Sequence, residues 1–241
     1  MERLGSHFRL TMDRYARQTM VDGFGREGQQ RLSEASALIV GLGGLGAPVA
    51  MYLASSGIGR LGLCDLDTVS LTNLQRQILY TERDLGQRKA LCAAKRLTAM
   101  SSTTGLDIYD TGLTPENAES IISQHDIVVD CTDNFRTRLL IDSVCASLGT
   151  PWVHGSIDGM YGTVAVFNHH SGLRYTDLYP DASEMAKAPS RVIGTLGPVP
   201  GIVGSIQALE TIKVLTGCGE PLDGQLLSLD LTNMTIEKIQ I

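Results

Sequence analysis

The sequence predicts an α/β domain whose mixed, mostly parallel sheet is continued by antiparallel strands at the C-terminal end. Three observations predict this class. Short β-prone apolar runs alternate with segments of helical spacing up to residue 150, a glycine-rich turn follows the first of these runs, and strand-like alternation takes over after Pro151. Strands that alternate with helices pair in parallel, so the first part should form a Rossmann-like nucleotide-binding sheet with helices on both faces.

The first half of the chain contains four expected strands, each a short β-prone run bounded by glycine or a charge. The helices between them carry apolar residues at helical spacing, as Leu91, Ala94 and Leu97 do, and Thr114 with Pro115 has the pattern of a helix start. Polar residues 14–34 indicate short helices before the first strand. The strands are expected at 37–40, 61–64, 106–109 and 126–130, and the helices at 44–56, 87–100, from Thr114 onward, and at 135–148.

The second half changes character and is expected to extend the same sheet. Two alternating segments at 152–156 and 163–167 are joined by a glycine-rich turn, and residues 226–231 and 235–239 have the pattern of a closing hairpin. A helix is expected at 201–216, and a long polar crossover loop at about 169–195, where loops of this length are usually functional. We therefore interpret residues 1–241 as one domain, with N-terminal helices (1–36), a nucleotide-binding half (37–150) and a second half (151–241).

The composition is that of a globular protein, with 43% hydrophobic and 19% charged residues. The formal net charge of −6 disfavours nucleic acid as a partner, because phosphate backbones are bound by basic surfaces. The uncharged stretch 35–59 is long enough to span a membrane, but it contains six glycines and a proline and is better interpreted as a strand, a turn and a helix. Neither a nucleic-acid partner nor a membrane span is expected.

The cysteines predict a reduced protein. None of the five is spaced as C-x-x-C, and Cys64, Cys92 and Cys145 lie in apolar segments as small core residues. Neither a zinc site nor a disulfide framework is expected, and thiols of this kind are typical of the cytoplasm. Residues 1–13 lack the apolar core of a signal peptide.

A nucleotide fingerprint lies between the first expected strand and the first long helix. Its G-x-G-x-x-G spacing provides a tight turn, a close approach of phosphate to the backbone, and close packing of helix on strand, while the helix N-terminus offers N–H groups to the phosphate. Asp65, at the end of the second strand, is placed to accept hydrogen bonds from ribose hydroxyls. The fingerprint glycines are Gly41, Gly43, Gly44 and Gly46.

Further polar residues follow other strands and point away from NAD. Because parallel strands end at one edge of the sheet, these side chains should surround one crevice. They add cations and a second carboxylate to the phosphate site, which a nucleoside triphosphate with magnesium requires and a dinucleotide does not. They are Asp67, Thr72, Asn73, Arg76, Gln77, Lys89, Thr132, Asp133 and Asn134.

The ordered set of motifs resembles the ThiF/MoeB/HesA group of the ubiquitin-activating-enzyme superfamily. The resemblance covers essentially the whole chain, and its motifs are specific in combination. They are Arg14 to Gln18, Gly41 to Gly46, Asp65 to Gln77, Lys89, Asp130 to Asn134, Gly197-Pro198, and Ala208 to Glu210.

The resemblance implies a homodimer that uses ATP and Mg²⁺ to adenylate the C-terminal glycine of a ubiquitin-like sulfur-carrier protein. It assigns the ribose to Asp65, the phosphates to Asn73, Arg76 and Lys89, and Mg²⁺ to Asp133. It also implies that Arg17 reaches the partner protomer's triphosphate and that residues 151–241 bind the carrier.

Two departures from the group's pattern affect these expectations. Most members carry two C-x-x-C pairs that bind structural zinc, and here the region 173–180 has no cysteine and the last strand is not followed by a second pair. Many members also carry a cysteine in the crossover loop, at a position that Ser190 occupies here. We therefore expect no covalent enzyme–carrier intermediate and a separate sulfur donor, for which a cysteine desulfurase is one candidate.

Several alternatives stay open at this point. The crossover segment favours thiamine biosynthesis as the pathway, with molybdopterin biosynthesis as its alternative. A tRNA-modifying ATP-dependent dehydratase of the same superfamily is disfavoured by the acidic composition. An NAD-dependent oxidoreductase lacks a recognisable general acid, since His125, His154, His169 and His170 are in no known motif context. A non-catalytic binding subunit is disfavoured by Arg76, Lys89 and Asp133 together.

Overall fold

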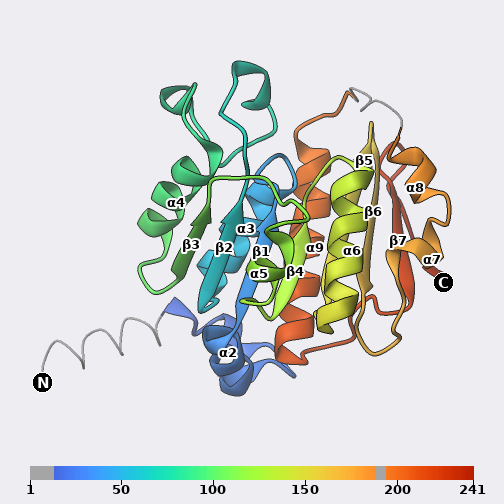
Figure 1. Cartoon of the computed structure of the whole chain (residues 1–241). Helices are drawn as coiled ribbons and strands as arrows, with labels where there is room; N and C mark the ends of the chain where they lie inside the picture. The colour runs from blue at the N-terminus through green and yellow to red at the C-terminus, as the bar shows by residue number, and fades with distance from the viewer. Residues whose placement is uncertain (1–13, 188–193) are drawn as a thin grey trace, which may run out of the picture.

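The computed structural model describes residues 14–187 and 194–241, and in these ranges eight strands form one sheet in the order β3-β2-β1-β4-β5-β6-β7-β8 (Figure 1). Strands β3 to β5 pair in parallel, and β5 to β8 pair antiparallel. The expected mixed sheet is therefore confirmed. The strands are β1 (Ser36–Val40), β2 (Arg60–Cys64), β3 (Gly105–Tyr109), β4 (Ile127–Asp130), β5 (Trp152–Asp158), β6 (Tyr161–Phe167), β7 (Gln225–Asp230) and β8 (Thr235–Gln240).

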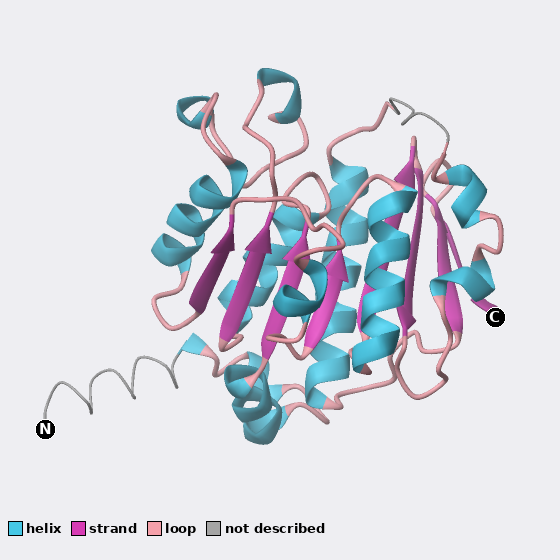
Figure 2. Cartoon of the chain, viewed as in Figure 1, coloured by secondary structure: helices cyan, strands magenta, loops and turns pink. Residues whose placement is uncertain are grey.

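Helices cover both faces of the sheet (Figure 2). Alternate residues of the central strands supply the two cores: Ala37 and Ile39 of β1 face one layer, and Leu38 and Val40 face the other. The first layer contains α2 (Gly25–Glu34), α3 (Gly46–Ser56), α4 (Lys89–Met100) and α9 (Pro198–Thr216), and the second contains α5 (Ala118–Ile122), α6 (Phe135–Leu148), α7 (Tyr175–Leu178) and α8 (Ala182–Met185). Single-turn 3₁₀ helices are η1 (Gln18–Met20), η2 (Leu71–Asn73) and η3 (Glu82–Asp84).

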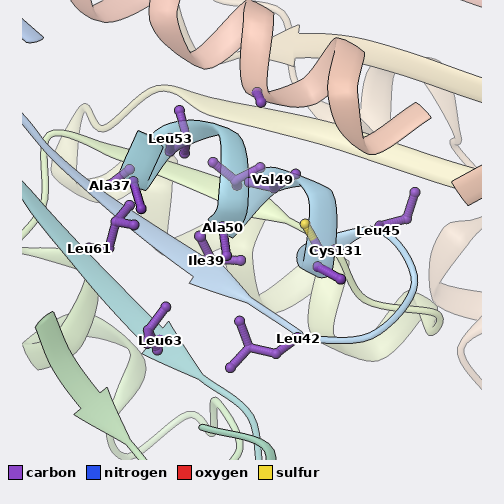
Figure 3. Packing of buried hydrophobic residues seen from close by; sticks show 14 of the residues in the cluster. Ala37, Ile39, Leu42, Leu45, Val49, Ala50, Leu53, Leu61, Leu63 and Cys131 are labelled. Atoms are coloured by element: carbon purple, nitrogen blue, oxygen red, sulfur yellow. The ribbon is translucent and has the colours of Figure 1, made fainter. Parts of the chain in front are cut away.

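Helix α3 is the element that fixes the nucleotide fingerprint on the sheet. Its Val49, Ala50 and Leu53 are fully buried and pack near Ile39 and Leu61 of the central strands (Figure 3). A fully buried valine or leucine side chain, such as Val49 or Leu53, contributes about 1.5–3 kcal/mol to stability. The apolar, uncharged stretch noted in the sequence is therefore explained by core packing. Among residues 14–187 and 194–241, no helix combines the length and apolar character of a bilayer span.

One expected helix start is wrong. The residues after Thr114 form a turn, and α5 begins at Ala118. The reason is Asn117, whose side chain accepts the Thr114 N–H and donates to the Gly112 carbonyl. These two bonds close a turn around Pro115 before the helix begins.

The expected crossover loop contains two short helices, α7 and α8, in its described part. Residues 188–193, which include Ser190, lie outside the described residues. Asp142 of α6 holds the start of α7, because its carboxylate accepts bonds from the Arg174 guanidinium and the Tyr175 N–H. The crossover segment is thereby attached to the helix that follows β4.

Candidate active site

A cleft of about 780 Å³ opens at the carboxyl ends of β1, β2, β4 and β5. This is the place where open α/β sheets bind ligands, and the volume is within the range of small-molecule sites. The predicted site residues that line it are Gly41, Gly43, Gly44, Asp65, Asp67, Arg76, Gln77, Lys89, Thr132, Asp133 and Asn134.

The glycine loop is held by contacts that larger residues would prevent. Gly41 has φ +91°, and a Cβ there would lie 2.7 Å from the Cys131 carbonyl oxygen. A Cβ on Gly46 would lie 2.0 Å from the Gly41 carbonyl oxygen, so this glycine serves helix packing and does not line the cleft. Gly43 and Gly44 do line the cleft, at the N-terminal end of α3, where backbone N–H groups favour anions.

Asp65 is buried and ties the second strand to the glycine loop. One carboxylate oxygen accepts the Leu42 N–H at 2.7 Å, and the other accepts the Asp67 N–H at 2.8 Å. Each oxygen can accept a further bond, so a ribose contact is compatible with this role. The carboxylate thus shapes the loop whether or not a nucleotide is bound.

The cationic side of the cleft comes from two segments. Lys89, at the start of α4, is almost fully buried, and its Nζ lies 2.9 Å from Asp67 Oδ2. Arg76 lines the cleft from the segment that follows η2, where its guanidinium donates to the Thr72 carbonyl. The carboxamide of buried Gln77 faces the same cleft, and its oxygen has no hydrogen-bond partner among the described residues.

Thr72 and Asn73 are predicted site residues that the structure does not bring to the cleft wall. The Asn73 side chain accepts the Ser70 N–H and caps η2. Thr72 is exposed, with its hydroxyl 3.1 Å from that of Ser70. In this state both residues shape the turn that carries Arg76, and their predicted contacts with the nucleotide stay predictions.

Asp133 is exposed in the cleft between β4 and α6, and among the described residues no hydrogen bond or ion pair engages its carboxylate. Its neighbour Asn134 caps α6, because its side-chain oxygen accepts the Thr137 N–H at 2.9 Å. A carboxylate that lines a cleft of this size has the donor chemistry that Mg²⁺ prefers.

Sequence reasoning missed a buried polar cluster beneath this turn. Asp130 is fully buried between His154 and Arg138, with His154 Nδ1 at 3.0 Å and Arg138 Nε at 3.4 Å from Oδ2. Burial alone raises the pKa of Asp130, but the hydrogen bond from His154 and the charge of Arg138 hold it below its ordinary value. Burial lowers the pKa of His154, which favours the neutral imidazole. The feature of the sequence that could have indicated this cluster is the aspartate Asp130 at the end of an apolar strand.

The cleft also contains residues of the second half that were not predicted. Ser156 and Asp158 from the end of β5, and Thr195 from the crossover segment, line its β5 side. The Thr195 hydroxyl donates to the Gly159 carbonyl at 3.2 Å, which joins the two segments. No motif in the sequence marked these residues.

Arg17 does not lie at this cleft. Its neighbour Gln18 donates to the Ser56 carbonyl at the C-terminal end of α3, whereas the glycine loop lies at the other end of that helix. Eleven helical residues separate these ends by roughly 16 Å. Within one protomer Arg17 therefore stays apart from the other predicted catalytic residues.

Burial disfavours the thiolate form of the two cysteines that line the cleft, Cys64 and Cys131. Burial raises the pKa of Cys64 to about 12 and that of Cys131 well above its ordinary value. Cys92 and Cys145 are buried as well, as their apolar surroundings predicted, and Cys218 is half-buried. The expected absence of zinc stays a prediction, which elemental analysis of the purified protein tests.

The fold and the cleft define an α/β protein of the Rossmann-like class, in which a glycine loop, carboxylates and cations surround one site large enough for a small-molecule ligand. Comparison with known proteins gives the family. Residues 15–241 match the ThiF family, and the chain belongs to this family. It is an adenylyltransferase, as its relatives are.

Two relatives illustrate the relationship. The sulfur carrier protein adenylyltransferase of Thermus thermophilus is 43% identical over 236 residues, which cover 95% of this chain and 87% of that protein. The adenylyltransferase and sulfurtransferase MOCS3 of Xenopus laevis is 43% identical over 234 residues, and the chain spans about half (51%) of its length.

Solved structures agree with the fold. The crystal structure of PaaA matches 96% of this chain and 74% of its own, with a TM-score of 0.82 and 24% identity. The structure of E. coli MccB with MccA-N7isoASN matches 95% of this chain and 72% of its own, with a TM-score of 0.80 and 21% identity. At these identities the likeness concerns the fold alone.

Proposed function

We propose that this enzyme adenylates the C-terminal glycine of a ubiquitin-like sulfur-carrier protein that ends in Gly-Gly, with release of pyrophosphate. The observation that carries the proposal is the convergence of the glycine loop, Lys89, Arg76 and Asp133 on one cleft. The name of the Thermus thermophilus relative supports the carrier as substrate. The acidic net charge fits a protein substrate better than tRNA.

The reaction needs charge neutralisation and alignment, and it needs no general base. The carrier's terminal carboxylate is ionised at neutral pH. One of its oxygens forms a bond to the α-phosphorus of ATP, and the bond from that phosphorus to the bridging oxygen breaks as pyrophosphate leaves. Lys89 and Arg76 stabilise the charge that moves onto the leaving group, which is electrostatic catalysis. Asp133 is the residue that would hold Mg²⁺, which supplies further charge neutralisation when it is bound.

The carrier's tail enters from the second half of the chain in this proposal. The glycine loop occupies the β1 side of the cleft, and Ser156, Asp158 and Thr195 line the β5 side. This arrangement leaves one side for the triphosphate and one for a second substrate. It supports residues 151–241 as the carrier-binding half.

We also propose a homodimer in which Arg17 serves the partner's cleft. Arg17 is exposed and lies a full helix length from the glycine loop of its own protomer. The adjacent helices α3 and α9 expose the apolar side chains Tyr52 and Leu209, each more than half accessible. A second copy of the chain that covers this surface would bring a foreign Arg17 to each site.

The pathway has two candidates. The crossover segment favoured thiamine biosynthesis in the sequence. The name of a Porphyra purpurea relative, a probable molybdopterin-synthase adenylyltransferase that is 39% identical, gives molybdopterin biosynthesis equal support. The carrier that the enzyme accepts distinguishes the two. A cytoplasmic location and a cysteine desulfurase as sulfur donor belong to the same proposal.

Pyrophosphate exchange into ATP tests the function and the pathway together. Purified enzyme is incubated with labelled pyrophosphate, ATP, Mg²⁺ and one candidate carrier at a time. Exchange that requires a thiamine-type or a molybdopterin-type carrier identifies the pathway. A carrier without its last glycine is the control and should support no exchange. Absence of exchange with every Gly-Gly carrier would contradict the proposal.

A further inference from the structure

The buried cluster of Asp130, Arg138 and His154 lies beneath the turn that carries Asp133, and no step of the proposed chemistry uses it. Three ionisable groups in the core cost desolvation, and a neutral apolar filling would serve stability equally well or better. The role of these three residues is therefore best inferred from the backbone segment that they hold in place.

Asp130 and Arg138 fix the peptide on the N-terminal side of Asp133. One oxygen of the Asp130 carboxylate accepts both the N–H and the hydroxyl of Thr132, at 3.0 and 2.6 Å. The Arg138 guanidinium donates to the Thr132 carbonyl at 2.7 Å. On the other side, Asn134 is fixed by its capping bond to α6. Asp133 is thus a single residue between two immobilised neighbours.

His154 holds the second oxygen of Asp130. Its Nδ1 lies 3.0 Å from Asp130 Oδ2, while its Nε2 is buried and has no hydrogen-bond partner among the described residues. The ring packs edge-on against Trp152 and Tyr175, with centroids 5.9 and 5.2 Å apart. A buried nitrogen without a hydrogen-bond partner destabilises a fold. The presence of a histidine here is therefore best explained by the hydrogen bond that its Nδ1 makes to Asp130.

We propose that His154 is a positioning residue for the adenylation reaction: its bond to Asp130 keeps that carboxylate oriented toward Thr132 and so fixes the turn that presents Asp133 to the bound metal–nucleotide. Without the Nδ1 donor, the Asp130 carboxylate rotates toward Arg138 and releases Thr132. The inference rests on the proposed metal role of Asp133. It also connects the turn to the crossover segment, because Tyr175 of α7 packs on the same imidazole.

The test compares three replacements of His154. The amide of His154→Asn superposes on Nδ1 and keeps a donor for Asp130, whereas His154→Gln places its amide at the position of Nε2, and His154→Leu has no donor. The measured quantities are kcat and KM in carrier-dependent pyrophosphate exchange, and the affinity of the enzyme–ATP complex for Mn²⁺ by electron paramagnetic resonance.

We expect His154→Leu and His154→Gln to lower kcat about 10- to 100-fold and to weaken Mn²⁺ binding by about tenfold or more, as the loss of outer partners of a metal ligand does. The KM for the carrier should change less than about threefold, and His154→Asn should recover most of both losses. If His154→Leu does not fold, the test is the comparison of His154→Asn with His154→Gln.

A matched control separates positioning from stability. His125 is also a buried histidine, and its Nε2 has no hydrogen-bond partner among the described residues, although the Asp107 carboxylate lies 3.8 Å away. It lies just before β4, at the amino end of that strand, beside β3 and α5. His125→Leu should lower the melting temperature without changing kcat or Mn²⁺ affinity in the folded enzyme. Equal losses in the His125 and His154 variants would overturn the inference, as would wild-type kcat and Mn²⁺ affinity in His154→Gln.

Asp133→Ala, measured in parallel, distinguishes the inference from the function on which it rests. If Asp133→Ala loses Mn²⁺ affinity and the His154 variants keep it, the positioning role is wrong and the metal role stands. If Asp133→Ala itself keeps wild-type Mn²⁺ affinity, the metal role fails and the inference fails with it.

Discussion

Lys89 and Asp67 form an ion pair in which the two partners differ in burial: Nζ lies 2.9 Å from Oδ2, and the lysine side chain is 6% exposed whereas the aspartate side chain is 59% exposed. An ion pair with one largely hydrated partner contributes little to the free energy of unfolding. The exposed carboxylate is solvated by water whether or not the pair forms. The arrangement keeps a desolvated ammonium group at the wall of the cleft. An anionic phosphate can take over from Asp67 as its partner.

The first prediction follows from this pair. Lys89→Met should leave the free energy of unfolding of the empty enzyme within about 1 kcal/mol of wild type, since an apolar side chain fills the buried space. Pyrophosphate exchange should fall about 100- to 1,000-fold, as it does when one charge-stabilising group is removed. Urea unfolding and exchange assays measure the two effects. A variant that is strongly destabilised and retains exchange would assign Lys89 a structural role.

Asp133 carries the second prediction. Asp133→Ala should lower exchange by about 100- to 1,000-fold or more while leaving the fold intact, because among the described residues no hydrogen bond or ion pair engages the carboxylate. Circular dichroism and exchange assays check both statements. Glu119→Ala, which removes an exposed carboxylate from α5, is the control and should exchange normally. Asp65→Ala should act differently and mainly raise the KM for ATP.

The third prediction concerns Arg17 and the proposed dimer. Arg17→Ala and Asp133→Ala should each be inactive, and mixed heterodimers should regain activity, because one of the two sites then contains both residues. Exchange measured after subunit mixing, with the mixing confirmed by differently tagged chains, gives the answer. No recovery in confirmed heterodimers would place Arg17 in its own protomer's site or outside both.

The fourth prediction concerns covalent chemistry. Burial raises the pKa of Cys64 to about 12 and that of Cys131 well above its ordinary value, so neither offers a thiolate at neutral pH. The serine at position 190 has no adjacent base in the sequence. Incubation with carrier and ATP should therefore give no covalent enzyme–carrier band on denaturing gels without reductant, and Ser190→Ala should retain adenylation. A reducible band that disappears in Cys218→Ser would show that Cys218 forms the link.

The sequence predicted the sheet and most of the cleft because both depend on local patterns. The strand–glycine turn–helix unit places Gly41 to Gly46 at the end of β1 whatever the rest of the chain does. The start of α5 was misplaced because Asn117 forms a side-chain turn that competes with the helix. Whether a side-chain-to-backbone bond replaces a backbone bond of the helix depends on local geometry, which the residue types alone do not specify.

The buried cluster could not be predicted for a different reason. Asp130 and His154 come from neighbouring parallel strands, and their register sets which side chains face each other across the sheet. Asp130 pairs directly with His154 in this register. A strand shifted by one residue would place the histidine on the other face. The same applies to Asp158, whose position at the end of β5 depends on the pairing of that strand with β6. Thr195 reaches the cleft from the crossover segment, through its contact with Gly159.

The central claim is that the enzyme joins AMP to the terminal carboxylate of a carrier, and one measurement tests it most directly. The intact mass of a Gly-Gly carrier is determined by mass spectrometry after brief incubation with enzyme, ATP and Mg²⁺. We predict a new species heavier by one adenylyl group, absent with Asp133→Ala and absent when the carrier lacks its last glycine. An unmodified carrier under conditions where wild-type enzyme consumes ATP would contradict the account.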